Sequence, residues 1–190
     1  KQKVDTLFQN VDRVKRIIDH IRSFSRSQKI VSFDNVDINT VINNSLLMVG
    51  TQFKDHGITL SVNLKENMPM IVGDKYKLEQ VVLNLLSNAR HAVDEKEEQS
   101  NLFDYQKQIE VTTYDDEVNV YISIKDNGTG ISQQNINKIY DPFFTTKKEG
   151  QGTGLGLSIA YGLIKDILGD IKVDSVMGEY TNFTLVIPKS

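Results

Sequence analysis

The sequence contains no cysteine and only three histidines among its 190 residues. The missing cysteines exclude disulfides and thiolate chemistry, and three scattered histidines form no obvious zinc site. No apolar run approaches the roughly 18 residues of a membrane span, and the N-terminus lacks a signal-peptide pattern. The net charge of −3 argues against a general nucleic-acid binder, which normally carries a basic stripe. We therefore expect a chain without nucleic-acid or membrane contacts, compatible with a reducing compartment.

The composition, with 39% hydrophobic and 25% charged residues, is that of a folded globular protein. We expect one domain over residues 38–190, preceded by a linker over residues 27–37. Residues 1–26 differ from the rest, because their apolar positions alternate in steps of three and four: Val4, Leu7, Val11, Val14, Ile18 and Ile21. This heptad seam predicts a coiled-coil-like helix that must pack against another helix, from a second chain or from sequence upstream of Lys1.

The remaining sequence alternates between helix and strand patterns. Helical periodicity predicts helices over residues 38–55, 75–95 and 155–168, the last closed by Gly169. Alternating patterns predict strands over residues 58–64, 109–114, 118–125, 171–176 and 183–187. This order predicts an α+β fold, a two-layer sandwich of one mixed sheet against three helices. Residues 131–152 fit no element, and loops of that length are lids, binding loops or disordered segments.

Three polar residues share one edge of the helix predicted over residues 75–95. Asn84, Asn88 and His91 fall within roughly 60° of one another around the helix axis. The neighbouring face is apolar and predicted to be buried, so the two amides lie at its margin. An unpaired buried amide costs about 1–3 kcal/mol, so both amides need backbone partners or solvent. The pattern is ordinary by itself and gains meaning from the glycine-rich segments that follow.

Two glycine-rich segments suit the two ends of a nucleotide. Asp126 closes a strand before Asn127–Gly130, and a buried carboxylate beside glycines can accept a hydrogen bond from the amine of adenine, although a simple Asx turn explains most isolated triplets of this kind. Residues 152–157, GTGLGL, run into a helix whose N-terminal N–H groups suit phosphate. This segment lacks the lysine of a P-loop and does not follow a strand as a dinucleotide fingerprint does. Mg²⁺ retains several waters, so one amide oxygen such as that of Asn88 suffices as its protein ligand.

Four ordered segments together resemble the ATP-binding domain of sensor histidine kinases, in the superfamily that includes DNA gyrase, Hsp90 and the MutL ATPases. NLLSNARHAV resembles the N box of that family, DNGTGI its first glycine box, DPFFTTK its F box and GTGLGL its second glycine box. The resemblance covers residues 34–188 and implies a Bergerat-type ATP fold. The helix of residues 1–26 resembles the second helix of the dimerisation and histidine-phosphotransfer region.

The resemblance implies ATP and Mg²⁺ as cofactors and assigns roles to individual residues. Asn88 would ligate Mg²⁺, Asn84 would contact phosphate or metal-bound water, and Asp126 would read the N6 amine of adenine. His91 stands where many members carry a phosphate-contacting lysine, so the alternative γ-phosphate contacts are Arg90, Lys147 and Lys148. The further site residues are those of the adenine pocket, the lid anchor, the phosphate cradle and their flanking positions: Gly128, Gly130, Ile131, Thr181, Phe143, Phe144, Gly152, Thr153, Gly154, Leu155, Gly156 and Leu157.

Two departures from the family patterns decide the predicted reaction. The gyrase and Hsp90 branch places a water-activating Glu where this chain has Asn84, and an amide is no general base, so phosphoryl transfer is favoured over hydrolysis. None of His20, His56 and His91 is followed by Glu or Asp, so we expect the acceptor histidine upstream of Lys1.

We therefore predict the catalytic part of a two-component sensor histidine kinase. It would pass the γ-phosphate of ATP to a histidine absent from this chain, for onward transfer to an aspartate of a response-regulator receiver domain. The resemblance also implies a homodimer through the N-terminal helix when the full bundle is present, and a cytoplasmic location whether or not the parent protein is membrane-anchored. The alternatives are a serine protein kinase of the anti-sigma-factor type and a non-catalytic dimerisation module with a degenerate nucleotide pocket.

Overall fold

A computed structural model describes residues 34–99, 104–147 and 152–189 of the chain. The predicted helix of residues 1–26 with His20, all but the end of the predicted linker, and Lys148 lie outside the described residues. The elements follow in the order β1 (Asp34–Val36), α2 (Ile38–Asp55), β2 (Thr59–Leu64), β3 (Ile71–Gly73), α3 (Lys75–Gln99), β4 (Gln108–Asp115), β5 (Asn119–Asp126), α4 (Gln133–Ile136), α5 (Gly156–Lys165), β6 (Asp170–Val176) and β7 (Tyr180–Pro188).

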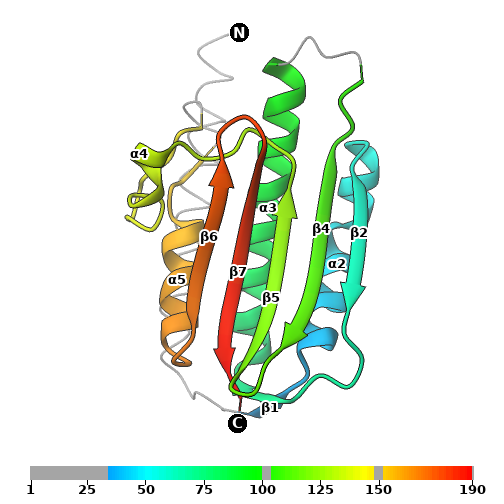
Figure 1. Ribbon diagram of the computed structural model, residues 1–190, viewed down its shortest axis with the longest axis vertical. Coiled ribbons are helices and arrows are strands. Elements are labelled where there is room, and N and C mark those ends of the chain that lie inside the picture. Colours follow the sequence, from blue (N-terminus) through cyan, green and yellow to red (C-terminus); the bar gives the residue numbers. More distant parts are fainter. Residues whose placement is uncertain (1–33, 100–103, 148–151, 190) are drawn as a thin grey trace, which may run out of the picture.

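The five longer strands form one mixed sheet in the order β2-β4-β5-β7-β6. The β2 and β4 strands pair in parallel, and the other neighbours pair antiparallel. Helices α2, α3 and α5 all cover one face of this sheet, with α3 in the middle (Figure 1). This arrangement confirms the predicted two-layer α+β sandwich. The small antiparallel sheet of β1 and β3 is separate from it.

Aspartates start both long helices, which explains why the chain turns into helix at these points. Asp37 Oδ1 accepts the N–H of Asn39 at the start of α2. Asp74 Oδ1 accepts the N–H groups of Tyr76 and Lys77 at the start of α3, at 2.9 and 3.2 Å. Each carboxylate satisfies N–H groups that have no partner inside the helix, and an N-cap of this kind contributes about 1 kcal/mol.

The core lies between the sheet and the three helices. One face of α3 is buried along its length, through Leu78, Val81, Val82, Leu85, Leu86, Ala89 and Val93. It packs on inward-facing residues of the central strands, among them Ile122, Ile124 and Leu185. Because α3 also packs against α5 on one side, the margin of its buried face that carries the two asparagines lies beside the start of α5.

Several local features differ from the prediction. The short elements β3 and α4 were not predicted, α4 lies in the segment expected to contain no element, and β7 begins at Tyr180 instead of residue 183. The end of the predicted linker forms β1, which the sequence did not indicate because a strand of three residues shows no period. The α3 helix runs to Gln99 instead of residue 95. The α5 helix ends at Lys165 rather than at residue 168, and Leu168, not Gly169, adopts the left-handed conformation that closes it, with φ of 60°. Adding a Cβ to Gly169 would bring it within 2.7 Å of the Val186 carbonyl oxygen, so this glycine is required by close packing on the sheet.

No helix among the described residues is both long and apolar enough to cross a membrane.

Candidate nucleotide-binding site

Asp126 is the last residue of β5, and its carboxylate is almost completely buried, with 4% of the residue exposed. Burial raises its pKa from 3.8 to about 7, while backbone N–H groups of Gly128 and Thr181 and the charge of Lys96 act in the opposite direction. The Gly128 N–H donates to Oδ1 at 2.9 Å. A buried carboxylate held at a strand end in this way suits a hydrogen-bond donor approaching from a ligand.

The turn after Asp126 requires its glycines because it packs directly on α3 and on the β6–β7 turn. A Cβ on Gly128 would lie 2.5 Å from the backbone carbon of Ala92. Gly130 has φ of 68°, and a Cβ there would lie 2.2 Å from the carbonyl oxygen of Val176. The Gly178 N–H donates to the Thr129 carbonyl at 2.7 Å. The two turns therefore enclose Asp126 at the end of the sheet where α3 ends (Figure 1).

Thr181 lies opposite Asp126 in the β5–β7 pairing and is also buried. Its hydroxyl is 3.1 Å from that of Ser175, which donates to the carbonyl of Tyr180 at 2.7 Å. Ser175 also accepts the N–H of Ile131 at 2.9 Å. Through Ser175, these hydrogen bonds connect Thr181, which was predicted to support the base, to the segment that follows the glycine turn.

The predicted phosphate end lies along α3 and at the start of α5. The Asn84 amide donates to the carbonyl of Gly156, the first residue of α5, at 3.1 Å. This bond holds the N-terminus of α5, where unpaired N–H groups point outward, against α3. Leu157 packs against the core, and the Leu155 N–H donates to the Thr153 hydroxyl at 3.4 Å. The second glycine box is therefore fixed to the helix that carries both asparagines.

Asn88 contacts Lys147, which follows 59 residues later in the segment that runs from the F box to the second glycine box and that we call the lid. Lys147 Nζ donates to Asn88 Oδ1 at 3.1 Å, so the amide oxygen of Asn88 already faces a cation. Burial and the neighbouring charge of Arg90 lower the pKa of Lys147 to about 8. Burial, followed by the charges of Lys147 and Arg90, lowers the pKa of His91 to about 4, so His91 is neutral at pH 7. Arg90 and Lys147 are both half-buried and repel each other, and such a pair of cations suits an anion.

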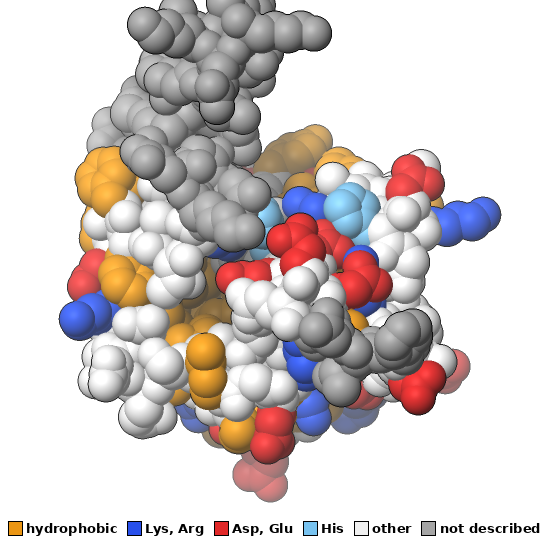
Figure 2. All heavy atoms as spheres, turned by 90° about the horizontal axis from the view of Figure 1, so that it is seen from above, with side chains coloured by type: hydrophobic (Ala, Val, Ile, Leu, Met, Phe, Trp, Pro, Cys, Tyr) orange, Lys and Arg blue, Asp and Glu red, His pale blue; other side chains and the backbone are white. Residues whose placement is uncertain are grey.

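Asp94 is the main counter-charge of this region, and sequence reasoning missed it. Its carboxylate pairs with Arg90 NH1 at 3.2 Å, His56 Nδ1 at 2.8 Å and Lys107 Nζ at 3.0 Å. Arg90 Nε is buried and has no hydrogen-bond partner among the residues that the structure describes. Seen from the end of the molecule where α3 ends, acidic, basic and histidine side chains gather beside one another (Figure 2). The spacing of four residues between Arg90 and Asp94 is a local signal for that pair. His56 and Lys107 reach α3 only through long-range folding, so no local pattern indicates their contacts with Asp94.

The lid begins with the segment that contains both phenylalanines. Phe144 is half-buried and packs against the core, as expected of an anchor. Phe143, expected beside it in the same role, is 69% exposed and has a φ of 68°. The Phe143 N–H instead donates to the carbonyl of Gly154 at 2.9 Å, which joins the two ends of the lid.

Alanine at Gly154 is expected to destabilise the lid, whereas alanine at Gly162 is not. Gly154 has φ of 67°, and a Cβ there would lie 2.3 Å from the backbone carbon of Phe143. Gly162 lies inside α5, and among the described residues a Cβ added there would meet nothing within 4 Å apart from its own chain neighbours and the adjacent helix backbone. We expect Gly154→Ala to cost about 1–3 kcal/mol of unfolding free energy and to weaken ATP binding. Gly162→Ala should stabilise by about 0.5–1 kcal/mol. Urea unfolding and calorimetry measure both, and equal effects of the two changes would contradict this assignment.

The donor set fits Mg²⁺ held mainly by a nucleotide rather than a metal site made by the protein alone. Within the described residues, no three His, Asp or Glu side chains are grouped to hold a metal ion. The Asn88 amide oxygen, which faces the ammonium of Lys147, is an oxygen donor of the kind that Mg²⁺ accepts. The phosphates and water would complete such a coordination shell.

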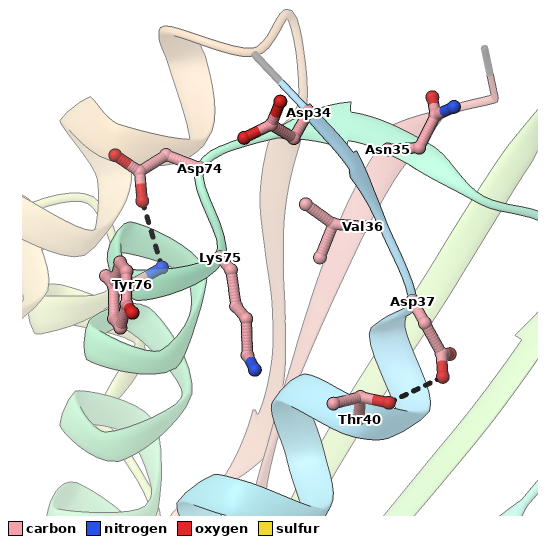
Figure 3. Close-up of a pocket in the computed structure, with 8 residues that line it drawn as sticks. All are labelled: Asp34, Asn35, Val36, Asp37, Thr40, Asp74, Lys75 and Tyr76. Carbon is pink, nitrogen blue, oxygen red and sulfur yellow. Dashed lines mark hydrogen bonds between the residues drawn. The ribbon is translucent and has the colours of Figure 1, made fainter. Parts of the chain in front are cut away.

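A cavity of about 350 Å³ lies elsewhere, at the start of α2 and α3 (Figure 3). Its polar groups are largely helix caps: Asp37 accepts the Thr40 hydroxyl at 2.6 Å, and Asp74 caps α3. Asp126 and the two asparagines do not line it. The candidate site is therefore at the opposite end of α3 from this cavity.

The structure brings the predicted residues into two neighbouring groups along α3. Asp126, Gly128, Gly130, Ile131 and Thr181 form one group, and the other contains Asn84, Asn88, Arg90, His91, Lys147 and residues 152–157. Sequence reasoning missed Lys96 and Ser175 in the first group. Lys96 could have been found, because Asn84, Asn88, Ala92 and Lys96 follow one another at a spacing of four.

Comparisons with known proteins give a consistent result. Residues 73–190 match the family described as histidine kinase-, DNA gyrase B- and HSP90-like ATPase. The chain is 32% identical over 187 residues to the sensor histidine kinase ZraS of Escherichia coli K12. The aligned region covers 98% of this chain and 37% of ZraS. The chain therefore spans less than two fifths of the length of that curated relative.

Solved structures agree at the level of the fold. The catalytic domain of the histidine kinase ThkA superposes with a TM-score of 0.71 at 28% identity, covering 83% of this chain and 96% of that domain. ThkA in complex with the response regulator protein TrrA superposes with a TM-score of 0.77 at 23% identity, covering 100% of this chain and 51% of ThkA. The second likeness supports the fold alone.

Proposed function

Because this chain belongs to the family of histidine kinase-, DNA gyrase B- and HSP90-like ATPases, we propose that it is the ATP-binding catalytic part of a two-component sensor histidine kinase. The observation that supports this proposal best is the arrangement of side chains along α3. The buried carboxylate of Asp126 lies at one end. Beside it, a row of asparagines faces the start of α5 and Lys147 of the lid. In this proposal Asp126 reads adenine, while Asn84, Lys147 and the N-terminus of α5 hold the phosphates.

The chemistry that this chain offers is transfer rather than hydrolysis. Asn84 donates to the Gly156 carbonyl and offers no carboxylate to take a proton from water. Arg90 and Lys147 supply positive charge for the transferring phosphoryl group. Mg²⁺, held by Asn88 and the phosphates, would neutralise charge on the β- and γ-phosphate oxygens.

The partners follow from the same reasoning. ThkA forms a complex with the response regulator TrrA, and a response-regulator receiver domain is accordingly the proposed downstream partner of the protein to which this chain belongs. The phosphoryl group would reach it through a histidine that this chain does not contain. A homodimer through the N-terminal helix and a cytoplasmic location remain part of the proposal.

The proposal is tested by following labelled phosphate from γ-labelled MgATP. We expect the chain to bind MgATP in calorimetry but to retain no label, and to label an acceptor when the histidine-bearing domain of a sensor kinase such as ZraS is added. The label should be acid-labile, as phosphohistidine is. A His20→Gln variant, which should behave identically, serves as the control.

Three results would contradict the proposal. Label retained by the chain alone and lost in His20→Gln would place the acceptor inside it. Acid-stable label on an added protein would indicate a serine kinase. Absence of nucleotide binding would indicate a non-catalytic module with a degenerate pocket.

A further inference from the structure

Lys96, near the end of α3, reaches both turns that enclose Asp126. Its Nζ donates to the carbonyl oxygen of Asn127 at 2.7 Å and to that of Glu179 at 3.3 Å. The ammonium also lies 5.1 Å from the centre of the Tyr105 ring. Asn127 follows Asp126 directly, and Glu179 precedes the strand that begins beside Thr181. One cation from α3 therefore joins the two backbone segments that position the buried carboxylate.

The same cation balances an otherwise negative cluster. The carboxylate of Asp126 and the carbonyl oxygens of Asn127 and Glu179 lie around it, and its charge opposes the effect of burial on the Asp126 pKa. Tyr105, from the segment before β4, donates its hydroxyl to the Asn127 carbonyl at 3.1 Å. Burial and the charge of Asp126 raise the pKa of Tyr105, so it stays neutral. The N–H groups of Gly128 and Thr181 complete the surroundings of the carboxylate.

We propose that Lys96 is a positioning and specificity-determining residue for the nucleobase, which fixes the two turns and keeps the Asp126 carboxylate a hydrogen-bond acceptor. The inference rests on the proposed function, because it assumes that Asp126 faces the base. In this inference, Lys96 makes the site prefer a base with an exocyclic amine over a base with a carbonyl oxygen at the same position.

The chemical reason is that protonation changes what a carboxyl group can recognise. An ionised carboxylate only accepts hydrogen bonds, whereas a protonated carboxyl can also donate one. Adenine presents an amine donor at its 6-position, and hypoxanthine presents a carbonyl acceptor there. An ionised Asp126 therefore favours adenine, and a protonated Asp126 tolerates hypoxanthine. A site that pairs with a specific donor rejects analogues that lack it.

The test compares affinities for ADP and inosine diphosphate without Mg²⁺, by calorimetry from about pH 6 to about pH 8, below the range in which the hypoxanthine ring itself ionises. The ratio of the two dissociation constants cancels the titration of the phosphates and of His91 and Lys147, because both ligands carry the same diphosphate. The variants are Lys96→Met and Lys96→Arg. Lys125→Met is the matched control, since Lys125 also lies over a tyrosine ring, at 4.8 Å from Tyr180, and is exposed one residue from Asp126.

We expect discrimination against inosine diphosphate in wild type to rise with pH as Asp126 ionises. In Lys96→Met the midpoint should move up by about one pH unit, so that discrimination at pH 7 falls about tenfold and regains the wild-type value of pH 7 at about pH 8. Lys96→Arg and Lys125→Met should follow wild type. An unchanged midpoint in Lys96→Met, or equal weakening of both ligands at every pH, would overturn the inference. If wild type binds neither ligand, the proposed function fails and the inference fails with it.

Discussion

Asp126→Asn is expected to lower ATP affinity about 10- to 100-fold while making the domain more stable above pH 7. The affinity falls because the side-chain NH2 of asparagine either faces the adenine amine, so that two donors oppose each other, or turns away and leaves one donor unpaired. Either arrangement costs about 1–3 kcal/mol. The amide oxygen can still accept the Gly128 N–H that now bonds to Oδ1 at 2.9 Å. The turn should therefore keep its shape, and the loss should be confined to recognition of the base.

The gain in stability follows from the pKa of the buried carboxyl. Its folded-state pKa of about 7 lies above its ordinary value of 3.8, so folding takes up a proton between these values. The unfolding free energy contributed by Asp126 is therefore fully present below about pH 4 and is lost as pH rises to about 7. Asparagine carries no charge to desolvate, and we expect Asp126→Asn to gain about 1–3 kcal/mol over wild type at pH 8.

Urea unfolding at several pH values and calorimetric titration with ATP measure the two effects separately. Asp174→Asn provides the control, because Asp174 is an exposed carboxylate of β6 that accepts the Tyr180 hydroxyl at 2.9 Å. It should change neither ATP affinity nor the slope of stability with pH. Loss of affinity together with loss of stability at pH 8 would show that the carboxylate is structural and would argue against its role in reading adenine.

The parts of this structure that follow from sequence are those set by short-range patterns. The period of apolar residues predicted α2 and α3 to within a few residues, and Asp126 was expected at a strand end because glycines follow it. Gly128 and Gly130 were expected to shape the adenine pocket, and the structure adds that each packs too closely on Ala92 or Val176 to carry a Cβ. The sandwich follows because amphipathic helices and alternating strands must bury their apolar faces against each other.

The parts that could not be predicted depend on contacts between distant segments. Lys147 and Asn88 meet only because the segment that ends at Lys147 lies beside α3, and no spacing in the sequence predicts this contact. Two of the three partners of Asp94, His56 and Lys107, come from the end of α2 and the start of β4, so their contacts could not be predicted for the same reason. The different exposure of Phe143 and Phe144 could not be predicted, because two adjacent aromatic residues look equivalent in sequence, whereas in the structure Phe143 has a positive φ and is exposed.

Asn88→Ala is expected to remove the Mg²⁺-dependent part of ATP binding and to slow phosphoryl transfer to an added acceptor histidine at least about 100-fold. The reason is that the Asn88 oxygen is the protein ligand assigned to the metal, and loss of one ligand displaces the phosphates that share it. ATP affinity measured in EDTA should change by no more than about threefold, because the adenine contacts remain. Asn43→Ala, at an exposed position of α2, is the control and should leave all three quantities unchanged.

Lys147→Met separates the role of the amide from that of the lid cation, since Lys147 Nζ and Asn88 Oδ1 are in direct contact at 3.1 Å. Loss of the ammonium should weaken ATP binding about 10-fold both with and without Mg²⁺, because a cation near the phosphates attracts them in either state. The two variants should therefore differ in EDTA, where only Lys147→Met loses affinity. If Asn88→Ala also loses affinity in EDTA by the same factor, the amide acts by holding Lys147 in place, and its assignment as the metal ligand is wrong.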